Sequence, residues 1–298
     1  MDKRKIGRLP DFIAVGPPRT ATTWLDKVLR GHAGLPRQTK ETHFFARNYD
    51  QGLRWYENHF RDCGFEAVVG EICAAYFENS QARERIHTDI PGCKIICTLR
   101  NPVERLYSYY KLMRHNGRTE EGFEESINRH SKMLDSSRYA SLLREWQALF
   151  GKDRVLVALN DDLSADPQGY LDRIASFIGI PRITLSHSMT SRNRENTIET
   201  APRSAWLARN ARSFRFWLGS HQFYRTRRFL NRAGVWRFCF EGGEVFPPLD
   251  AAVKSRLRDL LRPEVEELEE LLQRDLSQWK EGGQAASPVA NYSQPQAN

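Results

Sequence analysis

Two strand–loop–helix units constrain the fold of this chain most. The first is "DFIAVG" at 11–16, which leads into "TATTWLDKVLRGH", where apolar side chains recur at helical spacing. The second is "KIICTLR" at 94–100, followed by "NPVERLYSYYKLMRH", in which Asn101 can cap a helix and Pro102 suits its first position. Short apolar strands that alternate with helices predict an α/β fold, with a mainly parallel sheet covered by helices on both faces.

The rest of the chain extends this alternation. Ser80 is the expected cap of one further helix, and Gly179 is the expected stop of another. The other predicted elements are strands at 66–72 and 154–160 and helices at 80–90, 164–180, 203–232 and 249–279.

Length and composition predict one main domain. With 298 residues, 40% of them hydrophobic, the chain can bury a sizeable core. We expect a single domain over 1–281, with 203–246 as a helical arginine-rich insertion or lid. The segment 282–298 has few large apolar side chains, which predicts a disordered tail.

Hydropathy and cysteine content exclude several classes of protein. There is no run of about 18 apolar residues, and "MDKRKIGRLP" lacks an apolar signal region, so we expect a cytoplasmic protein with no integral membrane span. The five cysteines are odd in number and lack CxxC spacing, which argues against a zinc site or a disulfide framework. We interpret them as reduced packing residues.

The positive charge of the chain is local. The formal net charge is +8, yet the stretch 201–240 contains nine arginines and no acid, so the rest of the chain sums to about −1. Large apolar side chains alternate with these arginines over 203–232, as in a helical hairpin with one buried face. The arginine-rich segment has three alternative roles: a solvated charged face, a lid over an acceptor, or transient binding to a membrane surface. Nucleic acid is not an expected partner, because no RNA or DNA motif accompanies the charge.

The loop "GPPRTATTWL" at 16–25 has the setting of a phosphate-binding loop, in which a strand ending in glycine feeds a helix. An ATP-type loop reads GxxxxGK[ST], but here Ala21, Thr22 and Thr23 follow Gly16 at that spacing without a lysine, and the cation is Arg19 instead. The loop predicts a site for a compact phosphate or sulfate group on its amides, hydroxyls and guanidinium.

A second cation is expected at the same place. Arg100 ends one predicted strand as Arg19 follows another, and parallel strands direct their carboxyl ends to one edge of a sheet, where ligands bind. Ser108 lies two turns into the helix after Arg100 and could share an anion with it.

The two motifs together resemble those of a known family. "GPPRTATTWL" resembles the 5'-phosphosulfate loop of sulfotransferases that use 3'-phosphoadenosine 5'-phosphosulfate (PAPS), and "LRNPVERLYSYY" resembles their 3'-phosphate motif, RxPxxRxxSxY. "KETHFFARNYDQGLRWYENHF" at 40–60 is similar to the acceptor-side segment of heparan sulfate O-sulfotransferases, especially the 3-O type. The resemblance covers most of 11–181 and implies a P-loop-like three-layer sandwich with a helical C-terminal part.

The resemblance also implies roles for particular residues. Glu41 matches the catalytic base, with Lys40 and His43 beside it, and Arg19 stands where the family often has a catalytic lysine. The implied nucleotide-binding residues are Arg19, Thr20, Ala21, Thr22, Thr23 and Trp24 on the 5' side, Arg100 and Ser108 at the 3'-phosphate, and Arg192 and Arg194 in a late basic loop.

The predicted activity is PAPS-dependent sulfuryl transfer to a hydroxyl, by in-line displacement and without a metal. The expected acceptor is a small molecule, as in natural product biosynthesis, or a carbohydrate. The absence of an export signal favours the small molecule, as does Ile72, which stands where heparan-type enzymes usually have a lysine. A P-loop-type small-molecule kinase and a noncatalytic anion-binding protein are the alternatives. The sequence leaves open the oligomeric state and whether a hydroxyl or an amine is sulfated.

Overall fold

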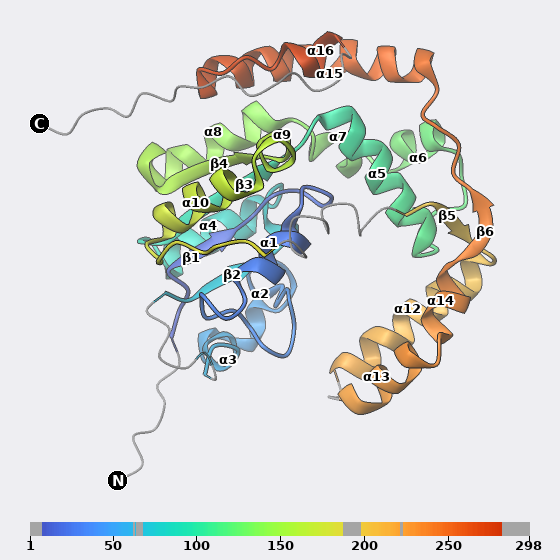
Figure 1. Ribbon diagram of the computed structural model, residues 1–298, viewed down its shortest axis with the longest axis horizontal. Coiled ribbons are helices and arrows are strands. Elements are labelled where there is room, and N and C mark those ends of the chain that lie inside the picture. The colour runs from blue at the N-terminus through green and yellow to red at the C-terminus, as the bar shows by residue number, and fades with distance from the viewer. Residues whose placement is uncertain (1–7, 62, 64–67, 187–197, 221–222, 282–298) are drawn as a thin grey trace, which may run out of the picture. The chain divides into compact units, whose positions relative to one another are not determined.

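The computed structural model describes residues 8–61, 63, 68–186, 198–220 and 223–281 (Figure 1). The chain divides into two compact units. We call the unit formed by 1–100, 139–193 and 262–298 the sheet unit, and the unit formed by 101–138 and 194–261 the arginine-rich unit. The tail predicted over 282–298 lies outside the described residues, and the single domain over 1–281 stays a prediction.

The sheet unit is built on four parallel strands in the order β2-β1-β3-β4. In the register, Ile13 of β1 lies opposite Glu71 of β2 and Ile95 of β3. The strands are β1 (Phe12–Ala14), β2 (Gly70–Ile72), β3 (Lys94–Leu99) and β4 (Val155–Leu159). The parallel α/β sheet predicted from the sequence is therefore confirmed.

Alternating side chains of the strands fill two separate cores, one on each face of the sheet. In β1, Phe12 and Ala14 pack on one face, whereas Ile13 and the following Val15 pack on the other. Side chains of a strand point alternately to opposite faces, so a strand that is apolar at every position must be covered on both. This pattern produces the three layers that Figure 1 shows, with helices on either side of the sheet.

Helices α1 (Thr22–Leu29), α9 (Asn160–Ala165) and α10 (Pro167–Ile178) supply the core on one face. The other face is covered by α2 (Phe44–Arg47), α3 (Leu53–Asn58), α4 (Ser80–Asp89), α8 (Tyr139–Phe150), the end of α15 (Ala251–Leu272) and α16 (Ser277–Glu281). Short 3-10 helices lie at Tyr49–Gln51, Ala74–Tyr76 and Lys152–Arg154. Among the described helices, none is both long and apolar enough to cross a membrane.

Several helix boundaries differ from the sequence prediction; for example, the helix predicted over 249–279 is divided into α15 and α16. Asn79, rather than Ser80, caps α4, because its side chain accepts a hydrogen bond from the Ala82 N–H and leaves Ser80 as the first helical residue. The helix predicted over 164–180 is two helices. Asp166 caps α10 by accepting from the Gly169 N–H, and Pro167, which has no N–H, starts it. Gly179 ends it with a φ of 83°, as expected.

The arginine-rich unit contains six described helices and a short antiparallel pair of strands. Asn101 caps the first helix as predicted, by accepting from the N–H groups of Val103 and Glu104. The elements are α5 (Pro102–His115), α6 (Phe123–Arg129), α7 (Lys132–Asp135), α12 (Ala205–Ser220), α13 (Tyr224–Arg232), α14 (Val235–Phe240), β5 (Thr200–Pro202) and β6 (Gly242–Val245). The start of α15 also belongs to this unit.

The five cysteines are buried free thiols, in agreement with their interpretation as packing residues. Burial raises the pKa of the thiols of Cys93 and Cys97 far above the usual value, which keeps both protonated and unreactive.

Candidate active site

The loops after three parallel strands meet at one edge of the sheet. The Cys73 N–H donates to the Ala14 carbonyl (2.9 Å) at the end of β1, and the Val15 N–H donates to the Ile96 carbonyl (2.8 Å) of β3. These bonds hold the three strand ends side by side, so that Arg19, Cys73 and Arg100 follow neighbouring strands. This is the edge at which open α/β sheets bind ligands.

The backbone of the 16–21 loop is tightly constrained. A Cβ at Gly16 would overlap the hydroxyl and carbonyl oxygens of Thr98, so only glycine fits there. The Thr20 hydroxyl donates to the Pro17 carbonyl (2.7 Å) and lies 2.8 Å from the Thr98 hydroxyl, so it serves to shape the loop. Arg19 and Ala21 have positive φ values of 80° and 64°, an uncommon backbone conformation for residues with a Cβ. Such residues cluster at functional sites.

Helix α1 begins directly after this loop. Ala21 is its N-cap and makes no side-chain cap hydrogen bond, so no side chain of the cap covers the first N–H groups of the helix. The Thr22 side chain is buried, and the Trp24 ring packs edge-on against Tyr170 at 5.8 Å in the core. Trp24 can therefore contact a ligand only through its backbone, whereas the helix start as a whole offers a positive end to an anion.

Two guanidinium groups lie close together beside the loop. Burial, and then the positive charge of Arg100, lower the pKa of the Arg19 guanidinium to about 10. Arg19 remains protonated at neutral pH, and the mutual repulsion identifies a region of concentrated positive charge. The parallel pairing of β1 with β3 makes Arg19 and Arg100 follow neighbouring strand ends, which agrees with the shared edge expected from the sequence.

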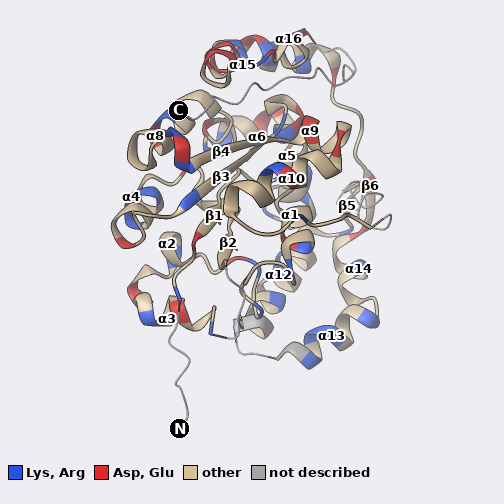
Figure 2. Ribbon diagram, turned by 60° about the vertical axis from the view of Figure 1, so that its left-hand side comes forward, with Lys and Arg blue, Asp and Glu red and all other residues tan. Residues whose placement is uncertain are grey.

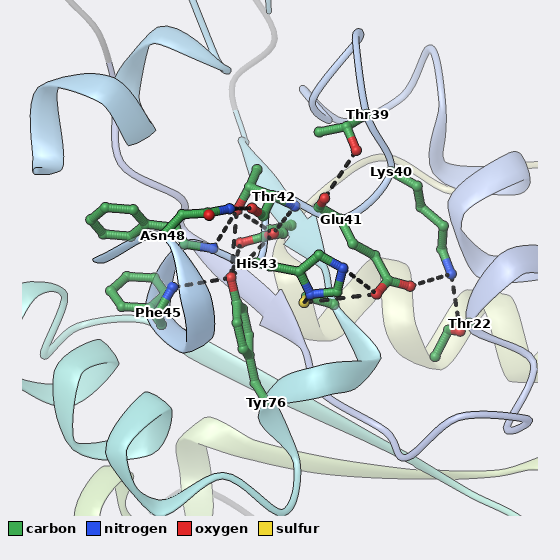
Figure 3. A network of polar contacts seen from close by, with 12 residues as sticks. Thr22, Thr39, Lys40, Glu41, Thr42, His43, Phe45, Asn48 and Tyr76 are labelled. Atoms are coloured by element: carbon green, nitrogen blue, oxygen red, sulfur yellow. Dashed lines mark hydrogen bonds and ion pairs between the residues drawn. The ribbon is translucent and has the colours of Figure 1, made fainter. Parts of the chain in front are cut away.

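Lys40 supplies a cation to the same loop from a distant segment (Figure 3). Its Nζ donates to the hydroxyl of Thr22 (3.1 Å) and approaches that of Thr23 at 3.4 Å. The same ammonium pairs with Oε1 of Glu41 at 3.2 Å. Thr22 stands at the lysine position of the ATP-type pattern GxxxxGK[ST], so Lys40 brings an ammonium to the residue that replaces that lysine.

Glu41, His43 and Cys73 form a compact polar cluster (Figure 3). Oε2 of Glu41 lies 3.6 Å from Nε2 of His43 and 4.0 Å from Sγ of Cys73, and that sulfur lies 3.6 Å from Nδ1 of His43. The Glu41 side chain is 23% exposed, so an incoming molecule can reach its carboxylate. One oxygen of Glu41 thus faces Lys40, and the other faces His43.

His43 is held as a neutral imidazole in an unusual backbone conformation. Burial lowers its pKa; the charge of Glu41 opposes this shift, and Arg47 and Lys40 add to it. Its φ is 53°, so three of the four described non-glycine residues with positive φ, namely Arg19, Ala21 and His43, belong to this site.

A buried carboxylate fixes the segment that carries these side chains. Oε1 of Glu71 accepts from the Thr42 N–H (2.8 Å) and hydroxyl (2.7 Å), and Oε2 accepts from the hydroxyls of Tyr56 (2.7 Å) and Tyr76 (3.2 Å). Glu71 is fully buried, and burial raises its pKa. Thr42 lies between Glu41 and His43, so Glu71 positions both. The sequence analysis did not assign this role, although a lone acid in the apolar run "AVVGEI" is a signal for a buried, fully bonded carboxylate.

The aromatic residues after His43 belong to the core. Phe44 and Phe45 are fully buried, and Phe44 stacks on Tyr56 with ring centroids 4.5 Å apart. Trp55 is partly buried against the same cluster. Tyr56 is therefore a core residue whose hydroxyl donates to Glu71.

Three of the other predicted site residues are not part of the described cluster around the loop and Glu41. Ser108 is a half-buried residue of α5 in the arginine-rich unit, so its predicted role at the 3'-phosphate stays a prediction. Arg192 and Arg194 lie outside the described residues. Arg105, the second arginine of the RxPxxRxxSxY pattern, is fully buried and donates to the Met133 carbonyl (2.7 Å) and the Ser137 hydroxyl, which gives it a structural role.

The cluster around Glu41 also contains metal-ligand atom types. Glu41, His43 and Cys73 each offer one ligand atom, and these atoms lie within 4.8 Å of one another. Burial, followed by the charges of Glu71 and Glu41, raises the pKa of the Cys73 thiol well above its usual value, which disfavours the thiolate that a metal requires. The expectation of a site without a metal stays a prediction.

The family model described as "Sulfotransferase domain" matches residues 9–225. Heparan sulfate glucosamine 3-O-sulfotransferase 6 of Mus musculus is 29% identical over 184 residues, which are 59% of this chain and 54% of that protein. Bifunctional heparan sulfate N-deacetylase/N-sulfotransferase 3 of Homo sapiens is 29% identical over 207 residues, 61% of this chain and 24% of that protein. The chain thus spans about half or less of the length of these curated relatives.

Among solved structures, a sulfotransferase from Alicyclobacillus acidocaldarius superimposes with a TM-score of 0.66 at 21% sequence identity. The match covers 92% of this chain and 99% of that one, and it shows that the two share the fold. The predicted P-loop-like three-layer architecture is thereby confirmed. Because the family model covers most of the chain and includes the 16–25 loop and the Glu41 segment, the chain belongs to the sulfotransferase family.

Proposed function

We propose that this protein transfers a sulfuryl group from PAPS to an acceptor hydroxyl, with Glu41 as the general base. The observation that carries the proposal is Lys40, whose ammonium contacts the threonine hydroxyls of the loop on one side and the Glu41 carboxylate on the other. This contact supports the proposal, because it brings the carboxylate close to the helix start that would bind the anion.

The loop residues fit the phosphosulfate end of the donor. The glycine at position 16 allows a close approach of the backbone, the start of α1 directs N–H groups outward, and Arg19 and Arg100 concentrate positive charge. In this proposal Arg19, Lys40 and the hydroxyls of Thr22 and Thr23 stabilise the charge that develops on the sulfuryl and leaving oxygens.

Glu41 is suited to take the acceptor proton. The acceptor oxygen forms a bond to sulfur while the bond between sulfur and the bridging phosphate oxygen breaks, so that 3'-phosphoadenosine 5'-phosphate leaves and the proton goes to the Glu41 carboxylate. Lys40 and His43 hold the two oxygens of that carboxylate from opposite sides. Such a reaction needs positioning and charge stabilisation from the protein rather than a resident cofactor.

The curated relatives favour a carbohydrate hydroxyl as the acceptor, because their names refer to heparan sulfate. A small-molecule hydroxyl is the alternative, and the loss of a cation at Ile72 supports it. A panel of both acceptor types, assayed for transfer of labelled sulfate from PAPS, distinguishes them.

The base assignment is tested with Glu41→Gln, which keeps the shape of the side chain and removes its proton affinity. We expect kcat to fall by about 10²-fold to 10⁴-fold, while calorimetry finds the affinity for 3'-phosphoadenosine 5'-phosphate changed by less than about threefold. Glu84→Gln, in an exposed side chain of α4, is the matched control and should retain full activity. Near-normal turnover by Glu41→Gln would rule out the assignment, and absence of nucleotide binding by the unmodified protein would rule out the proposed function.

A further inference from the structure

The helices α12 and α13 carry a surface that the sulfuryl-transfer site does not use. The stretch 201–240, which contains both, has nine arginines and no acidic residue, and Figure 2 shows blue without red along these two helices. Of these arginines, Arg209 pairs with Glu120 and Arg237 pairs with Glu241, both acids outside the stretch. We call the exposed side chains of α12, Phe223 and α13 the α12–α13 surface.

This surface exposes large aromatic side chains instead of burying them. The sequence predicted a hairpin with one buried apolar face, but the buried side of α12 consists mainly of the small residues Ala208 and Ala211 together with Leu218. The exposed aromatic residues, with exposed fractions, are Trp206 (69%), Phe214 (47%), Phe216 (73%), Trp217 (46%), Phe223 (47%) and Phe229 (69%). That expectation is therefore corrected: the small residues allow α12 to pack, and the large rings remain at the surface.

Three of the exposed rings, those of Phe214, Trp217 and Phe223, contact one another. Trp206 and Trp217 are eleven residues apart, about three helical turns, so they lie on the same side of α12. Trp217 stacks on Phe214 at 6.0 Å and on Phe223, before α13, at 5.6 Å. The group thus extends from one helix to the next, and exposed patches of this kind mark interaction sites in proteins.

Positive charges from the two helices also face each other. Arg215 of α12 lies over the Trp236 ring at 5.8 Å, and its pKa is lowered by burial and then by the positive charge of Arg227 from α13. Two guanidinium groups held together repel each other, and an anionic group between them would relieve the repulsion. A surface that carries both exposed aromatic rings and arginines matches a partner that is anionic at its surface and apolar beneath it.

We propose that the α12–α13 surface binds the headgroup layer of an anionic lipid bilayer. Tryptophan and phenylalanine side chains enter the boundary between headgroups and acyl chains, while arginines bind lipid phosphates, as in other helices that lie in the plane of a membrane. A second copy of the chain is a poorer match, because it would bring nine further arginines against the first nine. A purely polar polyanion would leave the six rings in water.

The test is flotation of the full-length protein with vesicles. We expect binding to vesicles of equal parts phosphatidylglycerol and phosphatidylcholine and not to pure phosphatidylcholine. Binding should weaken when salt rises from about 0.1 M to about 1 M, because the Debye length falls from about 10 Å to about 3 Å. Equal binding to both vesicle types, or none to the anionic vesicles at low salt, overturns the proposal.

Paired variants separate the contributions of rings and charges. Arg225→Gln/Arg228→Gln should reduce partitioning about 30-fold, at about 1 kcal/mol for each arginine near the surface. The matched control Arg138→Gln/Arg182→Gln removes two exposed arginines elsewhere and should stay within about twofold. Equal losses in the two charge variants contradict the assignment.

A second pair tests the aromatic side chains. Trp206→Ser/Phe229→Ser should reduce partitioning by about tenfold or more, since two rings no longer leave water. The control Val245→Ser/Leu260→Ser changes two apolar side chains of similar exposure, 68% and 55%, outside the surface. Thermal melting checks that all variants are folded. If heparin or duplex DNA binds as strongly as the vesicles do, and the ring substitutions do not change that binding, the proposal is overturned in favour of a soluble polyanion. If the ring variant instead loses a dimer that the unmodified protein forms, the proposal is overturned in favour of self-association.

Discussion

Replacement of Glu71 by glutamine tests whether this buried carboxylate positions the catalytic segment. Glutamine keeps the volume but has a single acceptor oxygen, so it can serve Thr42 but no longer accepts from Tyr56 (2.7 Å) and Tyr76 (3.2 Å); its amide N–H groups can only donate to the phenol oxygens, without the charge. A hydrogen bond to a charged acceptor contributes about 1.5–3 kcal/mol, and the longer bond contributes about 1 kcal/mol. Removal of a buried charge returns part of its desolvation cost, so we expect a net loss of about 2 kcal/mol in the free energy of unfolding.

The assay is urea unfolding at neutral pH, together with the same measurement on Tyr56→Phe and on the double variant. Tyr56→Phe removes one donor and should cost about 1–2 kcal/mol. The double variant should be less destabilised than the sum of the single variants by about 1 kcal/mol or more, because both changes remove the same bond. A cost below about 0.5 kcal/mol for Glu71→Gln, or strict additivity, would refute the reasoning.

The remaining predictions concern the charges of the site. Arg19→Lys keeps a cation and should retain kcat/KM within about tenfold, whereas Arg19→Ala should lose about 10²-fold to 10³-fold, and equal losses in steady-state assays would show that charge is not what Arg19 supplies. Because burial lowers the pKa of folded His43 below its ordinary 6.5, the unfolded chain binds the proton first, so the free energy of unfolding should fall as the pH decreases through that region. Urea midpoints measured from about pH 7 to about pH 5 should show a weaker decrease in His43→Asn, and an unchanged slope would contradict this account. Dialysis against EDTA should leave turnover intact, since Lys40 and Arg19 already supply cations; activity lost and then restored by zinc would instead assign Glu41, His43 and Cys73 to a metal.

Capping and stop residues in the sequence predicted helix ends correctly where the end depends on residues within one turn. Asn101 and Pro102 start α5 as expected, and Gly179 ends α10, because caps and stops depend on residues within one turn. The prediction of Ser80 as a cap was wrong, since the preceding Asn79 offers an equally short polar side chain and pattern alone does not rank two neighbours.

Contacts between distant segments were beyond the sequence pattern. Lys40 was expected beside Glu41, but its contacts with Thr22 and Thr23 join residues 18 and 17 positions apart, which no periodicity encodes. The hydrogen bond between Glu71 and Thr42 likewise joins residues 29 positions apart. The exposure of Trp206 was missed for another reason: an apolar side chain at helical spacing predicts burial only if a partner surface exists.

The position of Lys40 couples the two halves of the proposed reaction. The Lys40 ammonium contacts hydroxyls of the loop and an oxygen of Glu41 at the same time. The loop and the Glu41 carboxylate thus share one ammonium, which joins the donor side of the proposed reaction to its acceptor side. An anion bound at the loop would attract the ammonium and so weaken the ion pair between Lys40 and Glu41.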